Sequence, residues 1–245
     1  MSVKLTVVGC SPAWPNPGGA QSGYLVEDDS RRLLLDCGPG VLARLRALEE
    51  DDWPRVDAVV VTHWHLDHWG DLVPWVWGNM VGPGQELEQP ELWLPPLGRT
   101  RLRDFGARLG WEDMFETSFR FRDYQEGVPF EAAELEVTGV RVPHYTLRTY
   151  ALRVSNGKRT LVYSGDSGPS DALVGLARDA DLFVCEATLA HGELDGNPRG
   201  HLAADEAITA FEASGAKRLL LTHRPHELTP PDGYELASDG LEIAL

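Results

Sequence analysis

Residues 56–68 read VDAVVVTHWHLDH, and this stretch decides the fold class of the chain. Its first part, residues 56–62, is apolar and β-branched at nearly every position, which is typical of a strand covered on both faces. Three histidines and an aspartate follow that strand directly. Because strand ends in α/β folds commonly deliver side chains into a ligand-binding crevice, the stretch predicts a central strand that ends at a functional site.

The polar side chains of this stretch indicate a metal centre rather than a solvated loop. In an extended segment His63 and His65 point the same way and can meet one ion, whereas Asp67 and His68 can reach a neighbouring ion after a turn. Imidazole nitrogen combined with carboxylate oxygen favours zinc, with manganese or iron(II) as alternatives. We therefore expect divalent metal at the end of this strand.

Short apolar runs alternate with helical stretches along the chain, which favours an α/β architecture. Residues 4–10 predict a strand, and residues 22–38 predict a hairpin with its turn at 28–30. The Asn156-Gly157 pair predicts a second hairpin turn. Further strands are expected at 92–94, 134–142, 150–154, 160–164, 181–186 and 218–222, and helices are expected from Gly40 to about 48 and at 100–109, 170–178 and 203–214.

Length and composition indicate a globular, acidic protein. The chain has 245 residues, of which 42% are apolar, so we expect one domain spanning 1–245. Its 22 basic and 38 acidic residues give a net charge of −16, which disfavours binding to duplex DNA. No apolar run is long enough for a membrane span or a signal peptide, and Cys10, Cys37 and Cys185 are expected to be buried, reduced thiols. These features predict a cytoplasmic protein with no membrane partner, and a homodimer remains open.

The HWHLDH segment matches the HxHxDH signature, and here the chain resembles the metallo-β-lactamase-fold hydrolases. Later segments occur in that family's order, because RVPHY contains His144, YSGDS contains Asp166 and LLLTH contains His223. The resemblance covers the chain from the first strand to about residue 226 and implies a four-layer αββα sandwich. The ligands that it implies are His63, His65 and His144 for one ion, Asp67, His68 and His223 for a second ion, and Asp166 as the bridge between them.

Within that family the chain is most similar to the ribonuclease Z and cyclic phosphodiesterase branch. Residues 185–188, Cys-Glu-Ala-Thr, resemble the Glu-Ala-Thr element of the branch, and Gly200-His201-Leu202 resembles its Gly-His element. The resemblance implies that Glu186 hydrogen-bonds one ring nitrogen of His201, which then protonates the leaving oxygen as general acid. Asp67 is expected to act in catalysis as well as in metal binding. The bridging aspartate that the resemblance implies argues against β-lactam hydrolysis, since enzymes of that class typically carry a cysteine in the second site.

The expected substrate is a small or cyclic phosphodiester or a short RNA end, attacked by a hydroxide between two divalent ions, with Zn²⁺ preferred over Mn²⁺ or Fe²⁺. Ribonuclease Z generally carries a long tRNA-binding arm between the third histidine and the bridging aspartate. Between His144 and Asp166 of this chain, only two strands and a turn fit. The alternative reaction is hydrolysis of a carboxylic ester, thioester or lactone at the same centre, and a non-catalytic metal-dependent interaction protein is the third hypothesis.

Three side chains outside these motifs are candidates for substrate contact. Trp14 lies in a proline-rich loop between the first two strands, where its aromatic face suits a nucleobase. His191 and His226 lie in expected loops and receive no assigned role.

Overall fold

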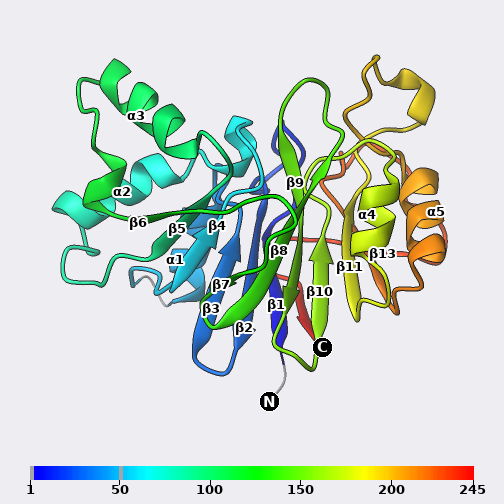
Figure 1. The fold of residues 1–245 in the computed structure, drawn as a ribbon, viewed down its shortest axis with the longest axis horizontal. Coiled ribbons are helices and arrows are strands. Elements are labelled where there is room, and N and C mark those ends of the chain that lie inside the picture. Colours follow the sequence, from blue (N-terminus) through cyan, green and yellow to red (C-terminus); the bar gives the residue numbers. More distant parts are fainter. Residues whose placement is uncertain (1–2, 50–51) are drawn as a thin grey trace.

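The computed structural model describes residues 3–49 and 52–245, and over these ranges two β-sheets pack face to face between two layers of helices (Figure 1). In spatial order, the first sheet contains β14 (Glu242–Ala244), β1 (Lys4–Gly9), β2 (Gly23–Asp28), β3 (Arg31–Leu35), β4 (Ala58–Val60), β5 (Glu91–Leu94) and β6 (Arg120–Asp123). The second contains β13 (Glu235–Leu236), β12 (Leu219–Thr222), β11 (Leu182–Glu186), β10 (Thr160–Tyr163), β9 (Thr149–Ser155), β8 (Leu135–Val142) and β7 (Phe130–Ala132).

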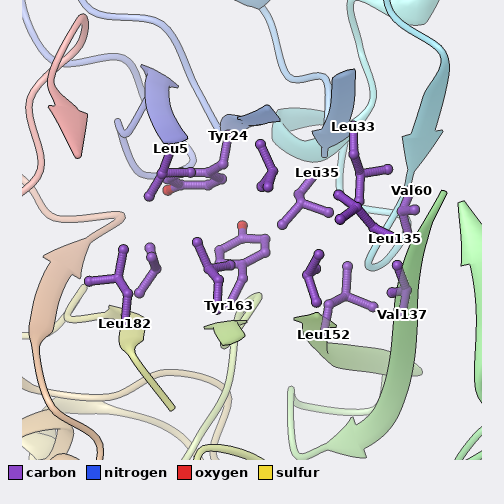
Figure 2. Packing of buried hydrophobic residues seen from close by; sticks show 14 of the residues in the cluster. Leu5, Tyr24, Leu33, Leu35, Val60, Leu135, Val137, Leu152, Tyr163 and Leu182 are labelled. Carbon is purple, nitrogen blue, oxygen red and sulfur yellow. The ribbon is translucent and has the colours of Figure 1, made fainter. Parts of the chain in front are cut away.

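The central core lies between the facing sides of the two sheets (Figure 2). Leu5 and Leu33 come from the first sheet and Leu152 comes from the second, and all three are fully buried. Tyr24 and Tyr163 meet in the same layer, with their ring centroids 4.6 Å apart. Burying one such leucine side chain contributes about 1.5–3 kcal/mol, so this layer holds the two sheets together.

The helices cover the outer faces of the sheets and complete the αββα sandwich that the family resemblance implied (Figure 1). On the first sheet lie α1 (Val41–Leu48), α2 (Leu72–Val81) and α3 (Gly98–Arg108), and on the second lie α4 (Asp171–Leu176) and α5 (Ala204–Ser214). Short 3₁₀ turns occur at η1 (Leu66–His68), η2 (Phe115–Thr117) and η3 (Gly192–Leu194). No helix in the described ranges is both long and apolar enough to cross a membrane.

Strand direction places several strand ends at the same edge of the sandwich. In the first sheet β3 and β4 are parallel neighbours, and in the second β10, β11 and β12 are parallel to one another. Because β8 and β10 are each antiparallel to β9, they also run the same way. Parallel strands end together, so the residues that follow these strands converge within each sheet.

Both predicted hairpins are confirmed, since β2 pairs with β3 and β9 pairs with β10 in antiparallel register. The expected central strand at 56–62 is present as the shorter β4, between β3 and β5. The sequence does not predict α2, because Pro74 and Gly78 interrupt its apolar run. Pro74 lies in the first turn, where the missing N–H breaks no helical hydrogen bond. The strands β6, β7, β13 and β14 are also unpredicted, each having only two to four residues.

Candidate metal centre

The histidine-rich segment leaves the first sheet after β4 and turns sharply at η1. His63 precedes the turn and is fully buried, while His65 is the residue at which the turn begins. Asp67 and His68 lie inside the turn and are buried. The turn therefore gives the two pairs different directions, as the sequence predicts.

One group of potential ligands joins this segment to the second sheet. His63, His65, His144 and Asp166 each present a ligand atom, and these atoms all lie within 4.8 Å of one another. His65 Nδ1 is 2.8 Å from His144 Nε2. Asp166 Oδ2 is 3.6 Å from His63 Nε2 and 3.7 Å from His144 Nε2. Three imidazoles and one carboxylate oxygen therefore converge on one point, which is a donor set suited to a divalent ion.

A second group lies on the other side of the same aspartate. It contains Asp67, His68, Asp166 and His223, again with ligand atoms within 4.8 Å of one another. Asp166 Oδ1 is 3.2 Å from His68 Nε2 and 3.6 Å from His223 Nε2, and Asp67 Oδ2 is 3.2 Å from His223 Nε2. Asp166 thus turns Oδ2 to the first group and Oδ1 to the second. This is the arrangement of a carboxylate that bridges two ions.

Unpartnered buried atoms show that the centre fits metal ions. His63 Nε2, His68 Nε2 and Asp166 Oδ1 are buried without a hydrogen-bond partner. Leaving a buried polar atom without a hydrogen bond costs about 1–3 kcal/mol of stability. The three residues that carry these atoms belong to the two groups of potential ligands. Cations at the centre would give all of them a partner.

The remaining ring nitrogens of four of the five site histidines bind acceptors that select the useful tautomer. An Nδ1–H that donates to an acceptor leaves the Nε2 lone pair free for a metal ion. The acceptors are Asp36 Oδ2 for His68 at 2.7 Å, the Gly200 carbonyl for His144 at 2.6 Å, Thr188 Oγ1 for His223 at 2.9 Å and Thr62 Oγ1 for His63 at 3.0 Å. The backbone and a surrounding layer of side chains therefore orient the rings.

Electrostatics at the centre agree with this donor set. Burial lowers the pKa of His63, so this imidazole is neutral and offers a lone pair. Burial opposes ionisation of Asp166, but His223 and His68 hold the pKa of its carboxyl well below the usual range. Burial also disfavours a charge on His68, yet the neighbouring carboxylates raise its pKa well above the usual value. The site therefore favours positive charge between its carboxylates.

Asp36 belongs to this centre although the sequence analysis assigns it no role. It follows β3 and is fully buried. Besides the bond from His68, its carboxylate accepts hydrogen bonds from the Thr62 backbone N–H at 2.8 Å, the Thr62 hydroxyl at 2.8 Å and the Tyr163 hydroxyl at 3.0 Å. The available signal is the RRLLLDCG segment, in which an apolar run ends in an aspartate like the other site-forming strands.

His201 and Glu186 form the contact that the resemblance implied. The His201 ring lies beside both groups of ligand residues, with its centroid 4.9 Å from that of His144. His201 Nδ1 is 2.9 Å from Glu186 Oε1, and the ring centroids of His201 and His223 are 5.8 Å apart. Glu186 is fully buried and also accepts a hydrogen bond from the Ser167 backbone N–H at 2.7 Å. Burial disfavours the charged imidazole, but Glu186 outweighs this effect and raises the pKa of His201 to about 9. Helix α5 begins at Ala204, so His201 precedes the helix and does not cap it.

Three other candidates lie outside the two groups of ligand residues. Trp14 is 50% exposed, and its role as a stacking surface stays a prediction. His191 precedes η3, and His226 Nδ1 lies 3.2 Å from Glu227 Oε2. The three cysteines are free and buried, as expected.

The sandwich and the paired histidine and aspartate groups at its strand ends define the class of metallo-hydrolases with the metallo-β-lactamase fold. A family model for the beta-lactamase superfamily domain matches residues 31–224. The chain therefore belongs to the beta-lactamase superfamily.

Individual relatives agree with this assignment. The "Probable metallo-hydrolase YhfI" of Bacillus subtilis is 33% identical over 91% of this chain and 88% of its own length. Its crystal structure has a TM-score of 0.83 and covers both chains completely, at 27% identity. Ribonuclease Z of Myxococcus xanthus is 28% identical over 90% of this chain and 86% of its own. The human short-form tRNase Z has a TM-score of 0.74 at 23% identity over 98% of each chain, which shows a shared fold.

Proposed function

We propose that this protein is a phosphodiesterase that hydrolyses a small or cyclic phosphodiester or a short RNA end. The observation that carries the proposal is the contact between His201 Nδ1 and Glu186 Oε1 at 2.9 Å, directly beside both groups of ligand residues. Phosphodiester cleavage expels a poorly stabilised alkoxide, and a positioned acid is the group that such a reaction requires.

The side chains of this site have distinct proposed roles. His63, His65 and His144 would hold one divalent ion, Asp67, His68 and His223 would hold the other, and Asp166, which faces both groups, would contribute to both. When bound, such ions neutralise charge on phosphoryl oxygens and lower the pKa of water. Glu186 accepts the Nδ1–H of His201, so the proton on Nε2 is the one available to the leaving oxygen.

Two features support a small substrate. The chain between His144 and Asp166 forms β9, β10 and their connecting turn, which leaves no segment for a protruding arm. The net charge of −16 also opposes capture of a long polyanion, which normally requires several basic contacts with phosphates.

Parallel assays test the proposal. Purified protein with Zn²⁺ or Mn²⁺ is given bis(p-nitrophenyl) phosphate, p-nitrophenyl acetate and a lactone, and an Asp166→Ala variant controls for contaminating hydrolases. We expect the phosphodiester to give the highest kcat/KM. Faster hydrolysis of the acetate or the lactone would instead identify a carboxylic ester or lactone hydrolase with the same centre.

A further inference from the structure

Tyr145 is an exposed aromatic residue at the edge of the metal centre to which neither the family signature nor the proposed mechanism assigns a role. It directly follows His144, and the two ring centroids are 5.0 Å apart. Its ring centroid is also 5.6 Å from that of His201. The residue nevertheless remains 41% exposed, which leaves part of its surface available to a ligand.

Several contacts hold the Tyr145 ring in place. Its backbone adopts the left-handed conformation, with φ of 47°, and its N–H donates to the Arg199 carbonyl at 3.0 Å. The ring packs against the backbone of Gly200, where a β-carbon would lie 2.4 Å from a ring carbon. Only glycine leaves room for the ring at this position, so the chain itself is shaped to hold an aromatic side chain beside His201.

Asp195 links the position of Tyr145 to that of His201. Burial raises the pKa of the Tyr145 hydroxyl to about 12, and the neighbouring Asp195 carboxylate adds to this effect. The same carboxylate accepts the backbone N–H of Gly200 at 2.7 Å and that of His201 at 2.9 Å. This carboxylate therefore fixes the Gly200 backbone against which the Tyr145 ring packs, and it fixes the backbone of the general-acid candidate His201 as well.

We propose that Tyr145 forms the surface on which an aromatic ring of the leaving group packs, and that this ring is a nucleobase. The proposal rests on the proposed function, because His201 protonates the leaving oxygen and thereby places the leaving group on its own side of the site. Tyr145 is the exposed aromatic ring that contacts His201 from that side. Every nucleobase can stack on an aromatic side chain. We therefore expect the site to prefer ligands that carry a base over ligands that lack one.

A matched pair of substrates isolates the contribution of the base. Adenosine 3′,5′-cyclic phosphate and methyl β-ribofuranoside 3′,5′-cyclic phosphate share the scissile bond and the leaving alkoxide, and only the first carries a base. For Tyr145→Leu, which keeps bulk against Gly200, we expect kcat/KM to fall about 5- to 150-fold on the nucleotide and less than about twofold on the base-free ester. Tyr145→Phe keeps the ring and should retain the wild-type ratio. Trp77→Leu changes an exposed aromatic residue of α2 and serves as the matched control.

A binding measurement separates this proposal from the proposed function. Calorimetric titration with adenosine 5′-monophosphate and with ribose 5-phosphate gives an affinity ratio that requires no turnover. We expect the wild type to prefer the nucleotide and Tyr145→Leu to lose most of that preference. An equal loss on both ligands, or an unchanged ratio, would show that Tyr145 only supports the loop, and would overturn the proposal. Absence of turnover on both cyclic esters would refute the phosphodiesterase assignment, while the affinity ratio would still decide the role of Tyr145.

Discussion

Asp36 Oδ2 lies 2.7 Å from His68 Nδ1, and both side chains are fully buried. The Asp36 carboxylate also binds the backbone and hydroxyl of Thr62, which directly precedes His63. A single carboxylate thus orients residues of both ligand groups, although the described structure places it outside either group.

Replacing Asp36 should weaken metal binding without removing a ligand. In Asp36→Ala the Nδ1–H of His68 loses its acceptor, and loss of such a partner typically lowers metal affinity about 10- to 100-fold. Competition with a chromogenic chelator measures the affinity, Asp36→Asn provides a variant of nearly equal volume, and Asp123→Ala controls for loss of an exposed carboxylate. Wild-type affinity in both Asp36 variants would contradict the orienting role.

Asp166→Ala should reduce the metal content of the protein. The wild type is expected to contain about two ions per chain, and because Asp166 faces both groups, the variant should lose most of one or both. Elemental analysis after gel filtration checks the content. A full complement in Asp166→Ala would refute the bridging role.

His201→Ala should impair proton donation while retaining the metal ions. We expect turnover to fall about 10²- to 10⁴-fold for an alkoxide leaving group and much less for p-nitrophenolate, which needs no proton. Glu186→Gln should produce a smaller change of the same kind, because it removes the carboxylate that holds His201. Glu193→Gln, in the neighbouring η3 turn, is the control. Equal losses for good and poor leaving groups would exclude His201 as the acid.

Metal removal should lower the thermal stability of the chain. Without cations, His63 Nε2 and His68 Nε2 remain buried without a hydrogen-bond partner. Binding of an ion at about a thousandfold above its dissociation constant contributes about 4 kcal/mol to the free energy of unfolding. Differential scanning calorimetry with and without a chelator measures the shift in Tm, and readdition of Zn²⁺ should reverse it. The shift should be smaller in Asp166→Ala, and an equal shift in the two proteins would contradict its origin at this centre.

Cleavage of small phosphodiesters should exceed cleavage of a precursor tRNA 3′ trailer. A cyclic nucleotide makes few phosphate contacts, so its kcat/KM should depend only weakly on salt. Measurements at two salt concentrations on both substrates check this expectation. Preferred and salt-sensitive cleavage of the precursor tRNA would show that a basic surface of the folded protein binds RNA despite the acidic net charge.

The sequence by itself determines the local arrangement of the ligand segment. His63 and His65 are two residues apart, and Asp67 and His68 lie in the turn that follows. Both features depend only on neighbouring residues, so the spacing along the sequence predicts them. The paired hairpins and the helix start at Ser170 are local in the same sense, because a turn pair or a capping side chain acts over two to four residues.

Only the tertiary structure decides how distant residues meet. Asp36 and Thr188 act through His68 and His223, respectively, and the two contacts join residues that lie 32 and 35 positions apart in the sequence. β14 forms only by pairing with β1 at the other end of the chain, and its three residues carry too little local pattern to predict a strand. The place of Tyr145 against Gly200 likewise requires both loops to be fixed by the sandwich. These contacts depend on how the two sheets pack against each other, and the spacing of residues along the sequence does not specify that packing.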